Sequence, residues 1–371
     1  MQRQRFVYVM IFVSVLFSCT TERKEYSVEM SQRLEFTLLD NEYISSRVQH
    51  IDFVPLELTE LSMFHDIDKI IFRNGLIYIG DFLMNKVVVY DMYGKLAFVV
   101  DRRGAGPGEY QELKSFTVDD ENIYILDNFR HGVYVYDCHT GDYKETRRLP
   151  VVASDVEALN NGDFLLAFVP TIHARLKHAQ PQYRIFVVGE DFSIKNGLFE
   201  YSDDEKDPVG KRTYFTTCGD SIVFSSFYFD GYTIFSRGDG SYRHIAIDFK
   251  DKVPEDCRHG EFELIREAGY QYISQVPVLC GGYVSVWVSS AGSMMSYFYD
   301  PNVQCFITHT RSSAKNFVLP PIGSYDGRYV SLLSSYDQYQ NLVGRGFAIA
   351  DEVIEHHLET EGYVLLFYTM K

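Results

Sequence analysis

An internal repeat with a fixed offset is the feature that most constrains how this chain can fold. Residues 77–91 match residues 123–137 at an offset of 46, with eight identities in fifteen positions. Each copy holds a β-rich run, a short polar loop, a second β-rich run and a turn containing Asp and Gly. A unit of this period built from short strands is typical of a β-propeller blade, whereas a β-sandwich does not repeat in this way.

Weaker copies of the unit extend the pattern along the chain. They begin after turn signals and cover 162–166, 221–224, 282–287 and 327–332. The total is six units, and four strands per unit predict an all-β, six-bladed β-propeller. A strand at 362–368 has no successor, and a strand at 47–54 has no predecessor. We therefore expect the N-terminal strand to join the C-terminal blade, which closes the ring and removes a free sheet edge.

The N-terminus has the features of an export signal. Arg3 and Arg5 precede an apolar run from Phe6 to Phe17, which is too short to span a bilayer but suits the core of a signal peptide. The run ends in Leu-Phe-Ser-Cys at Cys19, which resembles the lipobox of bacterial lipoproteins. This predicts a signal peptide over 1–18, lipidation of Cys19, a polar tether over 19–33 and one propeller domain over 34–371. An ordinary secretory signal with a chance cysteine is the alternative.

One loop carries a resemblance to a known family. Residues 103–110 read Arg-Gly-Ala-Gly-Pro-Gly-Glu-Tyr, and Val54-Pro55-Leu56-Glu57-Leu58 precedes the first unit. Both segments resemble the six-bladed β-propeller lipoproteins of Bacteroidetes, relatives of the NHL-type and TolB-like propellers, over about residues 34–371. The last strand follows Glu361-Gly362, where that family has Asn-Pro, so the last loop departs from the pattern. The resemblance implies a lipid-anchored protein of the bacterial cell envelope, and it implies architecture more than function.

Composition narrows the partners and the chemistry. The formal net charge of −16 argues against a nucleic-acid partner, because nucleic-acid binders carry a basic excess. The 15% aromatic content is expected to pack between blades, with Trp287 also in the core. Beyond Cys19, five cysteines show no metal-site spacing, and we expect buried free thiols, although a Cys257–Cys280 disulfide stays open.

Topology predicts which loops share a face. In an antiparallel blade, the loop between strands two and three opens on the same end as the connection to the next blade. The long segments therefore gather on one face, and the short turns at 91–94 and 137–141 lie on the other. Function concentrates in variable loops on a rigid scaffold, so the loop-rich face is the candidate binding surface.

Basic and aromatic residues on this face are the candidate ligand-binding groups. They comprise Arg102, Arg103, Tyr110, Asp127, Arg130, His131, His173, Arg175, Lys177 and His178. The basic members could steer an anionic glycan or peptide in an otherwise acidic chain. Alternatively, they form a solvated rim of weak ion pairs. For the Gly104–Glu109 loop the alternative to ligand contact is a tight structural turn. Asp81 and Asp127 occupy equivalent repeat positions at the end of a strand, where such carboxylates could hold a cation near the axis, and the alternative for both is turn capping.

Catalytic motifs are absent from the sequence. It contains no HExxH, no GxSxG, no P-loop and no cysteine–histidine nucleophile motif, and we predict no cofactor and no metal. Arg237-Gly238-Asp239 is read as part of a hairpin turn rather than as an adhesion motif.

The first hypothesis is a membrane-anchored extracytoplasmic binding or scaffold protein whose loop-rich face meets a glycan, a peptide or a cell-envelope protein. The alternative is a propeller lyase or hydrolase with a metal-assisted site at the axial mouth. A third hypothesis is a sensor or assembly subunit, which a large exposed apolar patch on one face would favour.

Overall fold

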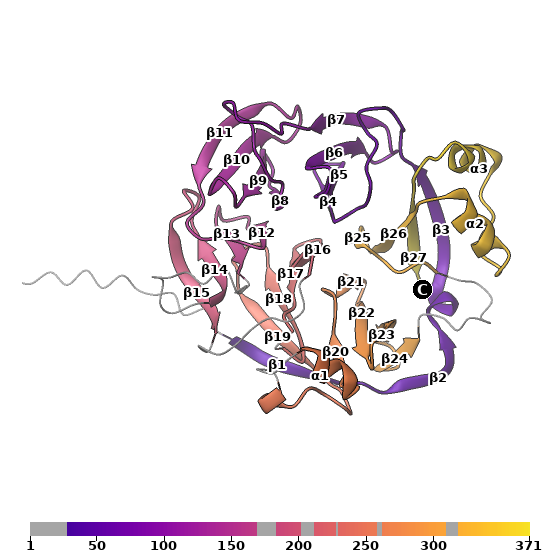
Figure 1. Ribbon diagram of the computed structural model, residues 1–371. Coiled ribbons are helices and arrows are strands. Elements are labelled where there is room, and N and C mark those ends of the chain that lie inside the picture. The colour runs from indigo at the N-terminus through magenta and orange to yellow at the C-terminus, as the bar shows by residue number, and fades with distance from the viewer. Residues whose placement is uncertain (1–27, 169–182, 202–210, 228, 258–261, 309–317) are drawn as a thin grey trace, which may run out of the picture.

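The computed structural model arranges six sheets, each with an antiparallel core, around a central axis, which confirms the predicted six-bladed β-propeller (Figure 1). It describes residues 28–168, 183–201, 211–227, 229–257, 262–308 and 318–371. Blade one contains β4 (Lys69–Arg73), β5 (Leu76–Asp81), β6 (Lys86–Asp91) and β7 (Leu96–Val100). Blade two contains β8 (Ser115–Val118), β9 (Asn122–Asp127), β10 (Gly132–Asp137) and β11 (Tyr143–Arg148). Blade three contains β12 (Asp155–Ala158), β13 (Phe164–Ala167), β14 (Tyr183–Val188) and β15 (Ile194–Glu200).

The second half of the ring is less regular. Blade four contains β16 (Phe215–Cys218), β17 (Ser221–Phe224), β18 (Gly231–Ser236) and β19 (Tyr242–Asp248). In blade five the inner strand is split into β20 (Tyr272–Ile273) and β21 (Val278–Cys280), followed by β22 (Tyr283–Ser290), β23 (Ser293–Asp300) and β24 (Cys305–Thr308). Blade six contains β25 (Gly323–Tyr325), β26 (Arg328–Leu333), β27 (Val364–Met370) and β3 (Val48–Pro55).

The two ends of the chain meet in blade six, as predicted. β3 pairs antiparallel with β27, with Phe53 opposite Leu366, and so supplies the outer strand of the last blade. The structure adds two strands that the sequence did not predict. β1 (Val28–Glu35) pairs in parallel with β19, and β2 (Leu38–Tyr43) pairs in parallel with β24. Residues 28–33 of the predicted tether therefore belong to a strand on the outer edge of blade four.

Side-chain alternation explains why the sheets assemble into a ring. Successive residues of a strand face opposite sides of its sheet. The second strand of a blade therefore packs side chains against the blade before it and against the blade after it. Ile77 and Ile79 lie in the cluster shared with blade six, while Tyr78 between them lies in the cluster shared with blade two. Six clusters of this kind lie between consecutive blades and contain most of the buried aromatic rings. The predicted inter-blade role of the aromatic residues is confirmed.

Short helices lie among the long connections. They are α1 (Phe262–Glu267), α2 (Tyr336–Val343), α3 (Glu352–Glu359) and the 3-10 segments η1 (Ile44–Arg47) and η2 (Glu255–Cys257). The Asp351 carboxylate caps α3 by accepting from the Ile354 N–H. Connections between blades and between β26 and β27 are long, and these lie on the loop-rich face. The opposite end, the short-turn face, carries turns such as 92–95 and 138–142.

The structure shows the state of five cysteines and the character of the described helices. Cys138, Cys218, Cys257, Cys280 and Cys305 are all free thiols, so the Cys257–Cys280 disulfide does not form. Cys138 and Cys280 are buried, as expected for small apolar side chains. Among the residues that the structure describes, no helix has the length and apolar character needed to cross a bilayer.

Candidate functional site

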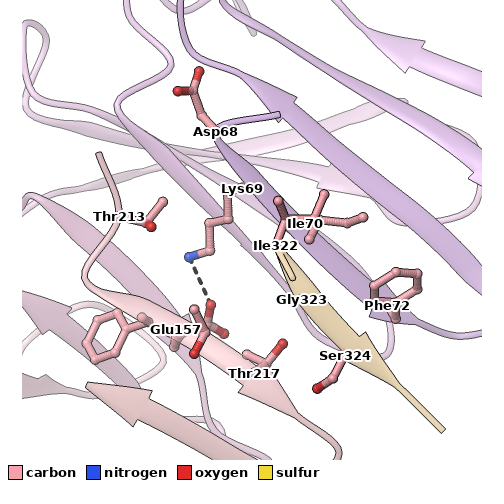
Figure 2. Close-up of a pocket in the computed structure, with 12 residues that line it drawn as sticks. Asp68, Lys69, Ile70, Phe72, Glu157, Thr213, Thr217, Ile322, Gly323 and Ser324 are labelled. Atoms are coloured by element: carbon pink, nitrogen blue, oxygen red, sulfur yellow. Dashed lines mark ion pairs between the residues drawn. The ribbon is translucent and has the colours of Figure 1, made fainter. Parts of the chain in front are cut away.

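The propeller axis is lined by polar side chains of the inner strands. Lys69 on β4 and the Asp155 and Glu157 side chains on β12 are all less than one-tenth exposed. The Lys69 Nζ lies 2.7 Å from Asp155 Oδ1, 2.8 Å from Glu157 Oε1 and 2.9 Å from the Val156 carbonyl oxygen. Figure 2 shows the lysine reaching across from blade one toward Glu157 in blade three. Burial lowers the pKa of Lys69, but the two carboxylates outweigh it and leave this pKa raised.

Arg237 completes what we call the axial ion network, which consists of Lys69, Asp155, Glu157 and Arg237. The Arg237 guanidinium, in the predicted hairpin turn between β18 and β19, donates to the Ala158 carbonyl at 2.9 Å and to Glu157 Oε2 at 3.4 Å. Because its side chain is only 4% exposed, an adhesion role for the Arg-Gly-Asp tripeptide is excluded. Burial lowers the pKa of Arg237. The network thus joins blades one, three and four by buried charges.

Neighbouring groups satisfy the remaining oxygen atoms of these carboxylates. Asp155 Oδ1 accepts from the Ser115 hydroxyl at 2.5 Å, and Asp155 Oδ2 accepts from the Tyr214 and Phe215 N–H groups at 2.7 and 2.9 Å. The Thr117 hydroxyl donates to Glu157 Oε2 at 3.1 Å. Buried charges are tolerated when they are paired and hydrogen-bonded, so this arrangement fixes the relative position of four blades.

The axis widens on either side of this network. A cavity of about 30 Å³ lies beside Lys69 and Glu157, with room for water but for no organic ligand. It shares Phe72, Thr217 and Ser324 with a cavity of about 200 Å³ toward the short-turn face. Toward the loop-rich face it shares lining residues with a cavity of about 560 Å³, which we call the axial cavity. Of these three connected cavities, the axial cavity alone has both the volume of a small-molecule site and a position on the predicted binding face.

Trp287 is the most informative residue of the axial cavity. The sequence interpretation of this single tryptophan as a core residue is wrong, because its side chain is only partly buried and lines the cavity. The indole N–H has no hydrogen-bond acceptor among the residues described. The other residues that line the cavity are aromatic, polar and apolar. They are Asp66, Ile67, Asp68, Lys211, Arg212, Thr213, Thr216, Tyr272, Ser274, Gln275, Val276, Val278, Ser285, Met294, Pro320, Pro321 and Ile322.

A break in the inner strand of blade five creates this environment. Ile273 pairs with Val288, and the next ladder pair is Val278 with Ser285. Four residues, Ser274 to Pro277, therefore stand opposite only Trp287 and Val286. This is an enlarged β-bulge of the special class, and β-bulges re-aim side chains and often lie beside functional sites. The inner strands of the other five blades pair without such a shift.

The structure gives Asp127 and Tyr110 structural roles. Asp127 is buried and accepts from the Gln111 N–H at 2.7 Å and the Arg130 N–H at 3.0 Å. Asp81 makes the equivalent bonds to His65 and Met84 at 2.6 and 2.8 Å, which confirms the turn-capping alternative for both residues. Tyr110 is fully buried and donates to the Asn85 and Val100 carbonyls at 2.7 and 3.1 Å, and burial raises its pKa. Neither side chain is placed to meet a ligand.

The Gly104–Glu109 loop is the tight structural turn given as the alternative. The Glu109 carboxylate folds back and accepts from the Gly106 N–H at 2.7 Å, and a Cβ on Gly104 would overlap that carboxylate. Gly108 has a φ of +73°, and the Tyr136 hydroxyl donates to its carbonyl at 2.8 Å. The motif therefore specifies close backbone packing at the junction of blades one and two.

The predicted basic residues are only partly brought together. Arg102, Arg103, Arg130 and His131 are exposed on the loop-rich face. Arg103 and Phe129 line an open hollow of about 570 Å³, separate from the axial cavity. His173, Arg175, Lys177 and His178, like Cys19, lie outside the described residues. Within the described part of the chain, no three His, Cys, Asp or Glu side chains gather where they could hold a metal ion.

Sequence reasoning missed Trp287, Arg212 and Gln275 as cavity residues. The available signal was Pro277, because proline within an inner strand is found at bulges. Arg212 precedes β16 and bridges to Asp66 and Asp68, which lie in a segment 144 residues or more away in sequence. No local pattern indicates such a contact.

Comparisons with known proteins agree with this architecture. A crystal structure of a Bacteroides fragilis protein, provisionally described as exported, has a TM-score of 0.74 at 18% identity and covers 92% of this chain and 100% of that chain. A DUF4221 family member from Bacteroides vulgatus has a TM-score of 0.51 at 10% identity and covers 87% and 97%. These likenesses concern the fold alone, and no curated protein matches the sequence. The family model DUF5128, described as a 6-bladed β-propeller, matches residues 23–259 and confirms the resemblance suggested by the GPGEY loop. The chain therefore belongs to the DUF5128 family of six-bladed β-propellers.

Proposed function

We propose that this protein is an extracytoplasmic, lipid-anchored binding module that takes a small organic ligand, or the end of a glycan or peptide, in the axial cavity. The observation that carries the proposal is the partly buried Trp287 in a cavity of about 560 Å³ on the loop-rich face. Ligand sites are typically concave, mostly preformed and lined by aromatic groups with a few placed polar groups. The axial cavity has each of these properties.

Rigidity beneath the cavity supports this function. The axial ion network lies below the cavity floor and ties blades one, three and four together. Thr216 on blade four donates to the Pro277 carbonyl at 2.6 Å, which holds the bulge of blade five in place. A preorganised site loses little conformational entropy when a ligand binds.

The extracytoplasmic placement rests on the sequence. Arg3, Arg5, the apolar run and the Leu-Phe-Ser-Cys tetrapeptide support export and lipidation at Cys19. The fold is shared with a Bacteroides fragilis protein that is provisionally described as exported. Labelling of the expressed protein with a radioactive fatty acid tests the anchor. Loss of label in Cys19→Ser is expected, and equal labelling of both proteins would remove the anchor from the proposal.

Tryptophan fluorescence tests ligand binding directly. Because Trp287 is the only tryptophan, its emission reports on the axial cavity without interference. Titration with neutral glycans, acidic glycans and short peptides should shift the emission for at least one class. A chain whose emission is unmoved by every class, while its fold is intact by circular dichroism, does not bind ligands in this cavity.

A protein partner is the second candidate function, and an apolar rim on the loop-rich face favours it. Leu61 and Leu83 are 69% and 67% exposed, Met63 and Met84 are 55% and 51% exposed, and Phe129 is 74% exposed. The first four lie on two touching loops, since Lys86 Nζ donates to the Leu61 carbonyl at 3.0 Å. Exposed apolar groups that cluster in this way are typical of protein contact sites. A partner captured by the wild-type chain should be lost with Leu61→Glu and Leu83→Glu, and retained with Tyr93→Glu on the other face.

A further inference from the structure

We propose that the axial cavity binds a neutral sugar ring, which lies against the indole of Trp287 and takes hydrogen bonds from Gln275 at the blade-five bulge. This inference rests on the proposed function and narrows it to one ligand class. It departs from the sequence-based expectation of an anionic ligand. Three properties of the cavity carry it: the charge of its lining, the chemistry of its walls and the rigidity of the bulge.

The charges that line the cavity cancel. Arg212 pairs with both acids at the mouth, reaching Asp66 Oδ2 at 3.0 Å and Asp68 Oδ1 at 2.5 Å. The Lys211 ammonium donates to the Ser225 carbonyl and hydroxyl oxygens at 3.2 and 3.4 Å. Two acids therefore balance two bases among the described lining residues. An anion would have to compete with Asp66 and Asp68 for Arg212, so the site favours a ligand without net charge.

The cavity wall combines an apolar surface with many neutral hydrogen-bonding groups. Trp287, Val276, Met294, Pro320 and Pro321 supply the apolar part. Hydroxyl and amide groups supply the polar part, from Thr213, Thr216, Ser274, Gln275 and Ser285. A sugar ring has the matching division, with C–H groups on its faces and hydroxyls around its edge. The electron-rich face of an indole attracts such C–H groups, and hydroxyl partners give specificity because a buried polar group left unpaired is costly.

The bulge holds Ser274 and Gln275 in position before any ligand binds. The Trp287 carbonyl accepts from the Ser274 N–H at 2.9 Å and from the Ser274 hydroxyl at 3.2 Å. Gln275 follows directly and is exposed, whereas Val276 beyond it is buried. Gln275 is therefore the amide that the bulge leaves free for a ligand at the cavity wall. An ordinary inner strand would place these residues in the ladder opposite β22 instead.

Peptides and acidic sugars are the competing occupants, and each predicts a different result. An extended peptide needs a row of backbone donors and acceptors, and the Trp287 carbonyl that the bulge faces already accepts from Ser274. An acidic sugar would have to draw Arg212 away from Asp66 and Asp68, or Lys211 away from the Ser225 oxygens. A neutral sugar needs neither of these.

The test uses the full-length lipidated protein in a zwitterionic detergent, which avoids sugar-based detergents. Trp287 emission is followed while maltose, cellobiose, lactose, diacetylchitobiose, digalacturonic acid or triglycine is added. At least one neutral disaccharide should shift and saturate the emission. Gln275→Ala should then weaken that affinity by roughly fivefold to tenfold, the size of one lost hydrogen bond. Trp287→Ala, followed by calorimetry, should weaken it at least about tenfold.

Matched controls distinguish a failure of the sugar assignment from a failure of the proposed ligand-binding function. Gln340→Ala changes an exposed glutamine on α2, and Tyr93→Ala changes an exposed ring on the short-turn face, so both should leave affinity unchanged. Saturable shifts with digalacturonic acid or triglycine but with no neutral sugar would overturn the sugar assignment and leave the binding site intact. No shift with any probe would overturn the proposed function itself. Binding of a neutral sugar that is insensitive to both Gln275→Ala and Trp287→Ala would place the sugar elsewhere and also refute the inference.

Discussion

At the residue scale, the axial ion network shows how a ring of blades can be held together from its centre. Lys69 contacts two carboxylates of blade three, and those carboxylates also accept from groups on blades two and four. A buried ion pair contributes little net stability against an apolar replacement, but removal of one partner strands the other charge. The axial ion network therefore fixes the relative positions of the blades, and we call this role a lock. Each charged member needs its partners to remain stably buried.

Lys69→Met is expected to destabilise the protein strongly. The substitution keeps the side-chain volume but leaves Asp155 and Glu157 buried without their cation, which should cost about 3–5 kcal/mol of unfolding free energy. Chemical denaturation followed by Trp287 emission measures the loss. Lys86→Met is the matched control, since Lys86 is equally buried but donates to the Leu61 carbonyl, and its loss should cost only about 1 kcal/mol. Equal losses for the two variants would contradict the lock.

Asp137 should make stability depend on pH in the acid range. The Lys144 ammonium, 2.9 Å away, and the N–H groups of His139 and Thr140 lower the pKa of Asp137 from 3.8 to about 2. A depressed pKa in the folded state stabilises the protein above the unfolded value near 4, and this contribution is lost as pH falls toward 2. In Asp137→Asn the unfolding free energy should fall less steeply between pH 4 and 2 than in the wild type. Parallel wild-type and variant curves over that interval would contradict this role.

At the element scale, regular strands were predictable and irregular ones were not. Runs such as 77–81 and 133–137 consist of β-forming residues that are buried on both faces of the sheet. The local sequence is therefore enough to predict that they form strands. The segment of β1 is polar and has no such pattern, because its stability comes from backbone pairing with β19 more than 200 residues away. The bulge at Ser274–Pro277 likewise depends on pairing with β22. The axial cavity could not be predicted for this reason, although the face on which it opens was predicted.

N-terminal truncation should distinguish β3, which closes the ring, from the strands that are added at the outer edges of other blades. A chain starting at Ile44 lacks β1 and β2 but keeps β3, so blade six stays complete and cooperative unfolding is expected at a reduced melting temperature. A chain starting at Leu56 also lacks β3, which exposes the edge of β27 along its whole length. That chain is expected to aggregate or to lose cooperative unfolding. Circular dichroism melts of both chains provide the measurement, and similar melts would show that β3 does not close the ring.

At the scale of the whole molecule, topology sets how the propeller stands relative to its predicted anchor. β1 runs parallel to β19, with Val28 opposite Tyr242 and Glu35 opposite Asp248. Tyr242 directly follows the β18–β19 turn, which lies on the short-turn face. The described chain therefore begins at the short-turn end of blade four. Eight residues lie between Cys19 and Val28, so the nine Cα-to-Cα steps that join them reach at most about 30 Å when fully extended. Lipidation at Cys19 would therefore hold the short-turn face toward the membrane and leave the axial cavity facing away from it.

Energy transfer to the membrane surface tests this orientation. In lipid vesicles with a dansyl-labelled headgroup, wild-type Trp287 on the loop-rich face should transfer weakly. The variant Trp287→Phe/Tyr93→Trp moves the single tryptophan to an exposed position on the short-turn face and should transfer more strongly. Cys19→Ser versions of both proteins, which lack the predicted lipid, should show only background transfer. Stronger transfer from Trp287 would mean instead that the apolar rim of Leu61, Leu83 and Phe129 rests on the bilayer. The axial cavity would then open toward lipid, and soluble sugars would have no direct path to Trp287.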